Sequence, residues 1–212
     1  MRTRTGAAMA SVAAAAIAGI TFLSWNPSGA SPRAAERSSA ELFSLATPTT
    51  KLRGPRVGCS RRSGGDFPGA FSDSANLVVG ALVLVGGARP QTPKTIREFG
   101  GQKFPLLVKA GHTVTVQLPQ GARRSAGLAY GGVGARGDLP EGEVKLRDSA
   151  RRMTFVACGR DERSGSQADG VAITFWSGFV LVRKPACVPL KVYLDHNNSP
   201  RRARLSMGRP CG

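Results

Sequence analysis

Hydrophobic and polar residues alternate over short runs along the chain beyond residue 58. The clearest run is 113–118, Thr-Val-Thr-Val-Gln-Leu, in which every second side chain is apolar. Strict alternation has a period of two, which is typical of a strand with one buried face. The runs 143–147, 152–158, 188–194 and 202–207 follow the same pattern. We expect each of these runs to form a strand.

Other runs are apolar without alternation, which is typical of strands buried on both faces. Residues 77–85 and 104–108 are of this kind. The runs 171–176 and 179–183 are separated by Ser-Gly, which predicts a tight hairpin or a bulge. Alternation places Phe175 and Trp176 on opposite sides of their strand, and we expect Trp176 to pack in the core, with a ligand-facing position as the alternative.

The segments between these runs are rich in Gly, Pro, Asn and Asp, and no segment beyond residue 58 keeps a 3.6-residue period for three turns. Many short strands with turn residues between them are typical of an antiparallel sandwich or barrel. The sequence therefore predicts an all-β fold, an antiparallel, immunoglobulin-like β-sandwich that forms a single domain over residues 58–212.

The first thirty residues have the pattern of a targeting segment. Arg2 and Arg4 precede an uncharged, mostly apolar run over 7–23, and Ser28 and Ala30 place small residues where signal peptidase cleaves. We interpret residues 1–30 as a cleaved signal peptide, with an uncleaved membrane anchor as the alternative. Residues 31–57 show no period and predict a disordered linker. The protein is thus expected to be secreted or held in the cell envelope.

The four cysteines, Cys59, Cys158, Cys187 and Cys211, are an even set without a C-x-x-C spacing. In an exported protein this set predicts two disulfides rather than a metal site. Three pairings are possible. We favour Cys158 with Cys187, across an intervening hairpin, and Cys59 with Cys211, which would join the ends of the domain.

Three segments resemble a pattern found in uncharacterised secreted or membrane-tethered proteins of high-GC Gram-positive bacteria. They are Phe-Val-Ala-Cys at 155–158, Thr-Phe-Trp-Ser-Gly-Phe-Val at 174–180 and Cys-Val-Pro-Leu at 187–190, against F-x-x-C, W-x-G-G-F and C-V-P-L. Phe179 stands in place of the second glycine of the W-x-G-G pattern. The resemblance covers residues 75–208 and implies an envelope location and a compact β domain. It implies no activity and carries over no functional residue.

The chain is strongly basic, with 30 Lys and Arg against 13 Asp and Glu and a net charge of +17. Residues 1–30 contribute only two of these cations, so the excess belongs to the rest of the chain. Alternation in the last two runs places several of these cations on one solvent-facing side of the strands. We expect Arg183 to extend this side. This predicted face consists of Lys191, Tyr193, Arg202, Arg204 and Arg183. Guanidinium groups bind phosphate and carboxylate in a bidentate way, whereas the plain alternative is a solvated surface.

Motifs for catalysis or cofactor binding are not expected to act here. The G-x-G-x-x-G spacing of residues 132–137 is followed by Pro140 and Gly142, which do not favour the helix that a dinucleotide site needs. His112 and His196 stand in predicted turns, where we expect solvated side chains. We therefore predict no cofactor, no metal and no catalytic residue.

The leading hypothesis from the sequence is a non-enzymatic envelope protein. Its basic face would bind an anionic envelope polymer, lipid headgroups or an acidic protein, whereas export and the lack of an aromatic stack argue against nucleic acid. A second hypothesis is an interaction module of an envelope complex that uses a sheet edge or the aromatic residues around Trp176. A third is a hydrolase whose site is not visible from residue spacing.

Overall fold

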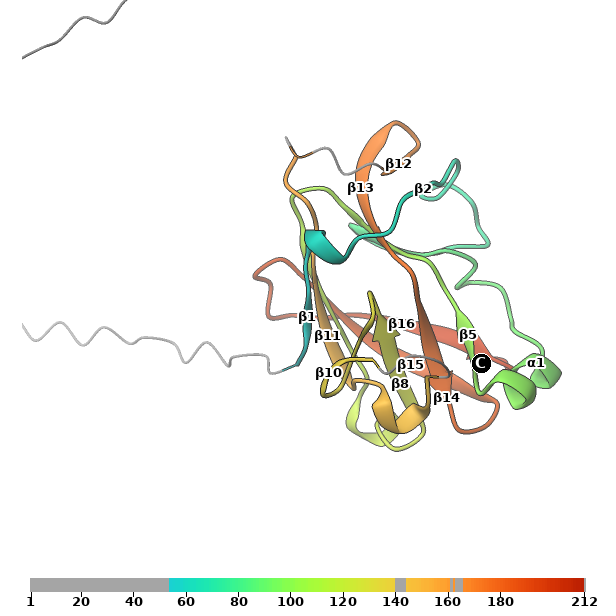
Figure 1. Cartoon of the computed structure of the whole chain (residues 1–212). Coiled ribbons are helices and arrows are strands. Elements are labelled where there is room, and N and C mark those ends of the chain that lie inside the picture. The colour runs from blue at the N-terminus through green and yellow to red at the C-terminus, as the bar shows by residue number, and fades with distance from the viewer. Residues whose placement is uncertain (1–53, 140–143, 161, 163–165, 212) are drawn as a thin grey trace, which may run out of the picture. The chain divides into compact units, whose positions relative to one another are not determined.

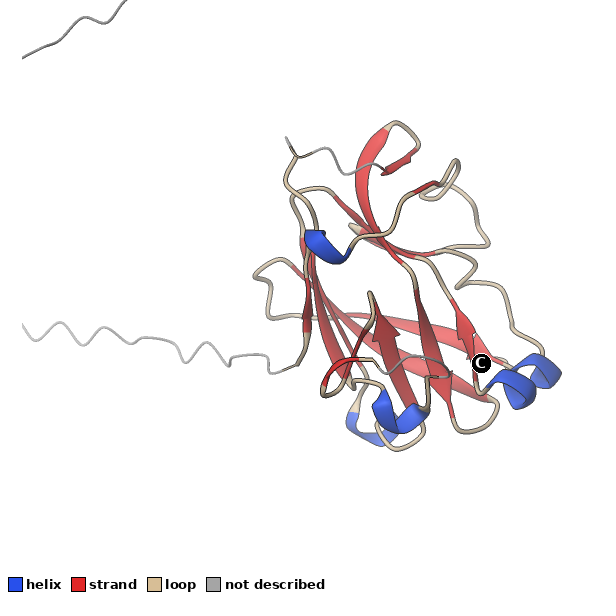
Figure 2. Cartoon of the chain, viewed as in Figure 1, coloured by secondary structure: helices blue, strands red, loops and turns tan. Residues whose placement is uncertain are grey.

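The alternating runs fold into strands of three β-sheets in a computed structural model of the chain, which describes residues 54–139, 144–160, 162 and 166–211. Strands make up most of the regular structure, and the few helices are short (Figure 2). The predicted signal or anchor over 1–30 and nearly all of the predicted linker over 31–57 lie outside the described residues. Among the described residues, no helix is long and apolar enough to cross a bilayer.

The first sheet, here called the β7 sheet, has the strand order β1-β11-β7-β15-β16 (Figure 1). Its strands are β1 (Arg56–Val57), β11 (Arg152–Val156), β7 (Thr113–Gln117), β15 (Ala186–Leu194) and β16 (Arg201–Met207). All neighbours are antiparallel except β1 and β11, which run parallel. The fold thus begins before residue 58, because Val57 of β1 is fully buried in the core.

The second sheet, the β8 sheet, has the order β10-β9-β8-β14-β5. Its strands are β10 (Gly137–Asp138), β9 (Val133–Gly134), β8 (Ala126–Tyr130), β14 (Gly178–Val182) and β5 (Gly101–Lys103). The glycines of the G-x-G-x-x-G spacing lie in and around the β9–β10 hairpin, and Pro140 and Gly142, which follow the spacing, lie outside the described residues.

The third sheet, the β6 sheet, has the order β2-β12-β13-β6-β4-β3. Its strands are β2 (Gly65–Asp66), β12 (Ser166–Ala168), β13 (Val171–Trp176), β6 (Leu106–Lys109), β4 (Leu82–Leu84) and β3 (Leu77–Val79). The apolar run 77–85 is therefore two strands. Gly80, with φ 62°, makes the turn between them, a conformation in which a side chain would be strained.

The β6 and β8 sheets share one bent pair of strands, so the prediction of a hairpin or bulge at Ser177-Gly178 is wrong. β6 pairs with β13 and β5 pairs with β14 in a single register that continues unchanged across the bend. The amide of Phe104 donates to the carbonyl of Gly178 at the bend, at 3.1 Å. The orange ribbon in Figure 1 follows this course from β13 into β14. Bent strands that pass from one sheet to another make the corners of many β folds.

One α-helix is described, α1 (Pro93–Phe99), and the sequence analysis missed it. Its seven residues are too few for a sustained 3.6-residue period. Local signals nevertheless mark both ends: the side chain of Thr92 accepts from the amide of Thr95, Pro93 is the first helical residue, and Gly100 ends the helix with φ 65°. These are the residue types that begin and end helices.

Three short 3-10 helices complete the regular structure: η1 (Cys59–Arg61), η2 (Gln120–Ala122) and η3 (Leu146–Asp148). The strand expected over 143–147 is wrong at its described end, because Leu146 and Arg147 belong to η3. The Asp148 carboxylate accepts from the amide of Lys145 at 3.2 Å, and the amide of Asp148 donates back to the carbonyl of Lys145 at 2.9 Å. This local capping overrides the alternating pattern.

The all-β class is confirmed, but the described strands form three sheets with two parallel pairings instead of the expected antiparallel sandwich. The main core lies between the sheets and includes the rings of Trp176, Phe155 and Tyr130. The Phe155 ring lies 5.4 Å from that of Trp176 and 5.6 Å from that of Tyr130, measured between centroids. Burial raises the pKa of the Tyr130 hydroxyl well above its usual range.

Two disulfides form, as expected, but the favoured pairing is wrong. Cys59 is bonded to Cys158, and Cys187 is bonded to Cys211, with Cα–Cα distances of 4.8 and 5.1 Å. Because β1 and β11 run parallel with Val57 opposite Phe155, the cysteines that follow the two strands arrive at the same place. A strand of two residues leaves no alternating pattern from which this pairing could be inferred.

The favoured bond between Cys158 and Cys187 fails on strand direction. β11 and β15 are both antiparallel to β7, so they run parallel to each other. Cys158 follows the end of β11, whereas Cys187 lies near the start of β15. Arg152 and Lys191 are level through Gln117, so the two cysteines are about ten residues apart along the strand direction, ~33 Å at a strand rise of ~3.3 Å per residue.

Candidate anion-binding surface

The β7 sheet buries one face in the core and turns the other to solvent. Along β15, Val188, Leu190 and Val192 are buried, while the residues between them are only partly covered. Along β16, Leu205 and Met207 are buried, and Arg202 and Arg204 are exposed. The predicted division of these two strands into core and solvent faces is therefore confirmed.

A row of polar and cationic residues crosses four strands on the solvent face. Arg152 of β11 is opposite Gln117 of β7, which is opposite Lys191 of β15, which is opposite Arg202 of β16. At a spacing of ~4.8 Å between strands, the Cα atoms of the first and last arginine are ~14 Å apart. Arg204 follows on the same face, opposite Pro189.

Arg56, Thr154, Thr115 and Tyr193 form the next row of the same face. The Arg152 side chain reaches this row and places its guanidinium carbon 5.3 Å from the centre of the Tyr193 ring. Stacking of this kind orients a guanidinium and leaves its edge available for an anion. We call the combined surface the basic face: Arg56, Arg152, Lys191, Tyr193, Arg202 and Arg204.

The basic face carries five cations, and none of the outward-facing residues of the five β7-sheet strands is acidic. Partial burial lowers the pKa of Arg152, and the positive charge of Arg123 lowers it further, while Tyr193 raises it. The guanidinium nevertheless stays protonated at neutral pH, because an arginine side chain is not deprotonated in proteins. Five positive charges therefore lie close together, and the same faces of these strands carry no acidic side chain that could neutralise them.

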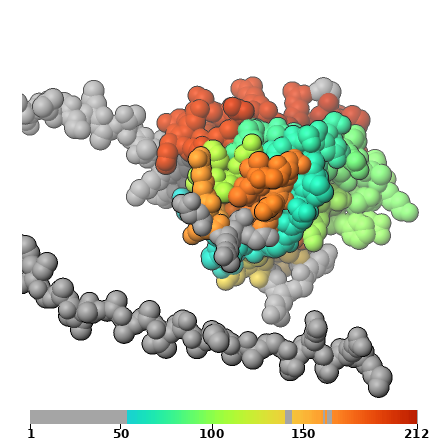
Figure 3. Space-filling model, turned by 90° about the horizontal axis from the view of Figure 1, so that it is seen from above, coloured from blue at the N-terminus to red at the C-terminus, as the bar shows by residue number. Residues whose placement is uncertain are grey.

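A groove of about 540 Å³ runs along the β16 side of the basic face. Pro119 and Pro189 give it apolar walls, and Lys191, Arg202 and Arg204 give it positive charge. The residues of β15 and β16, red in Figure 3, lie along one outer side of the domain. An extended anion could thus contact several cations along this side.

Arg183, the fifth residue of the predicted face, lies elsewhere. It follows β14 of the β8 sheet, and its amide donates to the carbonyl of Ser125. It lines a separate hollow of about 470 Å³ with Arg124, Lys145 and Arg147. The structure therefore brings together Lys191, Tyr193, Arg202 and Arg204 but does not bring Arg183 to them.

Arg56 and Arg152 belong to the basic face, and the sequence analysis did not place them there. Arg152 is the first residue of a predicted alternating run, so the sequence indicates that its side chain points outward. The sequence does not indicate which strand lies beside it. The order of strands in the β7 sheet joins segments far apart in the chain. Arg56 was assigned to the linker because β1 has only two residues.

Trp176 is a core residue, as expected. Its side chain is fully buried, and its indole nitrogen donates to the carbonyl of Gly58 at 3.1 Å. Phe175 points the opposite way, into a second apolar cluster, and its ring centre lies 4.8 Å from that of Phe67. Trp176 therefore makes no surface contact, whereas Phe179, its neighbour in the aromatic segment, is 37% exposed.

His112 lies beside an acidic residue, Asp195, and this pair is relevant to the hydrolase hypothesis. His112 Nδ1 lies 3.1 Å from Asp195 Oδ2, and the side chains are 32% and 47% exposed. The amide of Thr113 donates to Asp195 at 3.0 Å, and this backbone hydrogen bond is the main reason why the pKa of Asp195 is lowered. The pair thus lies at the protein surface. The sequence predicted a solvated side chain for His112.

A hollow of about 330 Å³ adjoins His112. The described residues that line it include Lys109, Arg160 and three apolar residues, but no Ser, Thr, Cys or acid. A base and an orienting acid without a nucleophile do not make a catalytic triad. His196 lies in the turn after β15, where its charge lowers the pKa of Asp195 slightly.

Comparison of the chain with models of known protein families, with curated proteins and with solved structures gave no match. The two disulfides indicate an oxidising, extracytoplasmic environment. The basic face is the described surface on which charge, stacking and a groove coincide.

Proposed function

We propose that this protein is a non-enzymatic component of the cell envelope that binds an anionic polymer or anionic headgroups through the basic face. The observation that carries the proposal is the row from Arg152 to Arg202, continued by Arg204, on a sheet face without outward-facing acids among its described strands. Such a row attracts a linear anion by neutralising several of its charges together.

The backbone of the sheet gives this surface a fixed spacing. Side chains of one row stand on neighbouring strands, so they are held apart by the hydrogen-bonded ladder and do not depend on a mobile loop. A ligand with regularly spaced negative charges gains from this rigidity, because little conformational entropy is lost when the protein side binds.

Two sequence-based expectations belong to this proposal. Export by a signal or anchor over residues 1–30 would place the basic face outside the cytoplasm, where anionic envelope polymers occur. An immunoglobulin-like arrangement of the strands stays a proposal about the fold. The disulfides support the first of these expectations.

The test is binding of long-chain polyphosphate and of phosphatidylglycerol vesicles by a variant with Arg202→Gln and Arg204→Gln. A cation beside an anionic surface contributes ~1 kcal/mol, so the loss of two weakens binding about tenfold to thirtyfold. The matched control is Lys94→Gln with Arg97→Gln, which removes the same charge from the exposed side of α1.

We expect the control to bind within about twofold of the wild type at the salt concentration of the assay. Equal losses in the two double variants would show that net charge acts without a defined surface, and would overturn the proposal. Retained binding in the variant with Arg202→Gln and Arg204→Gln would do the same.

One observation favours a second candidate function, an interaction module that uses a sheet edge. β16 is the last strand of the β7 sheet, and near its end the amide of Gln91 donates to the carbonyl of Ser206 at 2.9 Å. A partner strand could add to such an edge. Binding to a protein partner that is insensitive to salt would favour this function over the first.

A further inference from the structure

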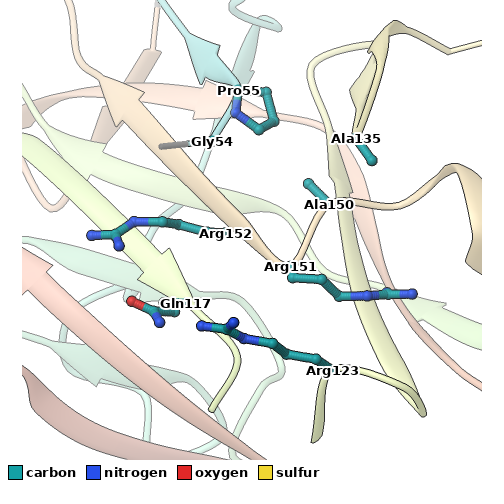
Figure 4. A pocket seen from close by; sticks show the side chains of 8 residues that line it. All are labelled: Gly54, Pro55, Gln117, Arg123, Ala135, Ala150, Arg151 and Arg152. Carbon is teal, nitrogen blue, oxygen red and sulfur yellow. The ribbon is translucent and has the colours of Figure 1, made fainter. Parts of the chain in front are cut away.

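A second cationic hollow adjoins the basic face at the β11 end of the row. It has a volume of about 270 Å³ and is lined by Arg123, Arg151, Arg152, Gln117 and small residues, among them Pro55 (Figure 4). No acidic side chain is among the described residues that line it. Three arginines thus line one hollow, and their hydrogen bonds distinguish their roles.

Arg151 has a structural role. Its terminal nitrogens donate to the carbonyls of Ala126 and Leu146 and, at 3.0 Å, to the hydroxyl of Ser149. These bonds tie the β11 end of the chain to β8 and to the η3 segment. In Figure 4 its side chain extends away from Gln117. The donors of Arg151 are therefore occupied, and we assign it no ligand.

Arg152 is different, because its donors are not used. Its Nε and Nη2 atoms are buried and have no hydrogen-bond partner among the described residues. The stack on Tyr193 holds the guanidinium in this position. A charged donor that is covered and unpaired is costly, so the site favours any anion small enough to accept from it.

Arg123 brings the second charge. It follows η2 and lines the hollow, and its Nε donates to the carbonyl of Leu118 at 3.3 Å, which orients the guanidinium. Figure 4 shows Arg123 extending toward the amide of Gln117. The two arginines are close enough that the charge of Arg123 lowers the pKa of Arg152.

We propose that Arg123, Arg152 and the Gln117 amide form a subsite for one phosphoryl dianion, either a phosphate monoester or free inorganic phosphate. The inference rests on the proposed function, since the subsite would anchor one phosphate of a ligand that extends along the row to Arg202. Two guanidinium groups match a charge near −2, which a phosphate monoester carries at neutral pH and a carboxylate does not.

The test is calorimetric titration of the full chain with inorganic phosphate and with glycerol phosphate. The variants are Arg152→Lys, which keeps the charge but removes the fork, and Arg123→Gln. Arg97→Lys on α1 is the matched control, because it makes the same change at an exposed side chain outside the basic face and the hollow. We expect saturable one-site binding, weakened at least tenfold by either subsite variant and less than twofold by the control.

The pH dependence separates phosphate from a general anion effect. Affinity for glycerol phosphate, a phosphate monoester, falls below about pH 6 as the dianion becomes protonated, whereas affinity for sulfate does not fall. Equal affinity for acetate and phosphate, or equal weakening by Arg152→Lys and Arg97→Lys, would overturn the subsite. Thermal melting of each variant reports whether it is folded, and Arg123, which is exposed, is changed without disturbing the core.

The two proposals fail in different ways. If polyphosphate binds but inorganic phosphate and glycerol phosphate do not, the subsite is wrong and the proposed function stands. If the small anions bind and the polymer and vesicles do not, the subsite stands and the proposed function is wrong. Tighter binding of glycerol phosphate than of inorganic phosphate would identify an esterified ligand, and the reverse would identify the free ion.

Discussion

The β6 sheet and the β7 sheet of this domain use their second faces in opposite ways. β4, β6 and β13 bury side chains on both faces, and the second apolar cluster on the β6 sheet includes Val83, Leu107, Ile173 and Phe175. The β7 sheet buries one face and leaves the other to solvent and cations. The face that another part of the chain covers is apolar. The open face carries the polar and cationic residues that an anion-binding surface needs.

The cover of the β6 sheet is built from the chain between β2 and β3. The Asp169 carboxylate accepts from the amides of Gly69 and Phe71, the latter at 3.1 Å, and Lys109 Nζ lies 4.5 Å from the centre of the Phe71 ring. The β7 sheet has no such cover among the described residues. All four disulfide cysteines instead lie in or directly beyond its strands. Covalent links thus stabilise the sheet that leaves one face open.

Removal of the Cys59–Cys158 bond should have the largest effect. This disulfide closes a loop of 99 residues, for which the chain-entropy model gives ~4–5 kcal/mol, against ~3 kcal/mol for the 24-residue separation of Cys187 and Cys211. Unfolding of the two Cys→Ser double variants in urea measures both. A larger loss for the shorter loop would contradict this ranking.

Phe175→Ala tests whether the covered sheet depends on its second cluster. Phe175 is 9% exposed and packs edge-on against Phe67, so we expect a loss of ~3–4 kcal/mol in the free energy of unfolding. Val171→Ala, on the same strand but 39% exposed, is the control and should cost less than about 1 kcal/mol. Similar values for the two would mean that the cover contributes little.

Asp195→Asn tests the polar link at one end of the open sheet. The hydrogen bond from Thr113 lowers the pKa of Asp195 in the folded protein, so its stabilising effect is present above pH ~4 and is lost as the pH falls through the folded value. We expect a loss of ~1 kcal/mol at pH 7, modest because Asp195 is half exposed. The melting temperatures of variant and wild type should converge as the pH falls below the lowered pKa of folded Asp195, and a constant difference would contradict the assignment.

Substitution on the basic face should have the smallest effect on stability. Arg202→Gln with Arg204→Gln changes exposed side chains, so the free energy of unfolding should stay within ~0.5 kcal/mol of the wild type. Urea unfolding checks this, and it makes the binding loss expected for the same variant interpretable. A loss of 2 kcal/mol or more would mean that these arginines are structural.

The sequence predicted the outward direction of single side chains better than the partners they meet. Alternation placed Lys191, Arg202 and Arg204 on one face, because consecutive strands of a hairpin share a local register. Arg152 joined that face only through β7, a neighbour chosen by the packing of the whole sheet. Arg123 lies in a turn segment without a period, so no pattern in the sequence indicates the hollow it shares with Arg152.

The errors have the same origin. The disulfide pairing depended on β1, a parallel strand of two residues, and the supposed hairpin at Ser177 is a bend whose partner strand lies 70 residues earlier in the chain. Local rules succeed where the contact is local, as at the ends of α1 around Pro93 and Gly100. Long-range contacts need the strand order, which one sequence does not contain.

The salt dependence of polyphosphate binding by the wild-type chain tests the central claim most directly. The logarithm of the affinity should fall linearly with the logarithm of the salt concentration, with a slope of about −0.7 to −0.9 for each phosphate neutralised. Contact along the row and its groove predicts a slope of about −3 to −4, for four or five cations. A slope near zero, or no binding at low salt, would contradict the account.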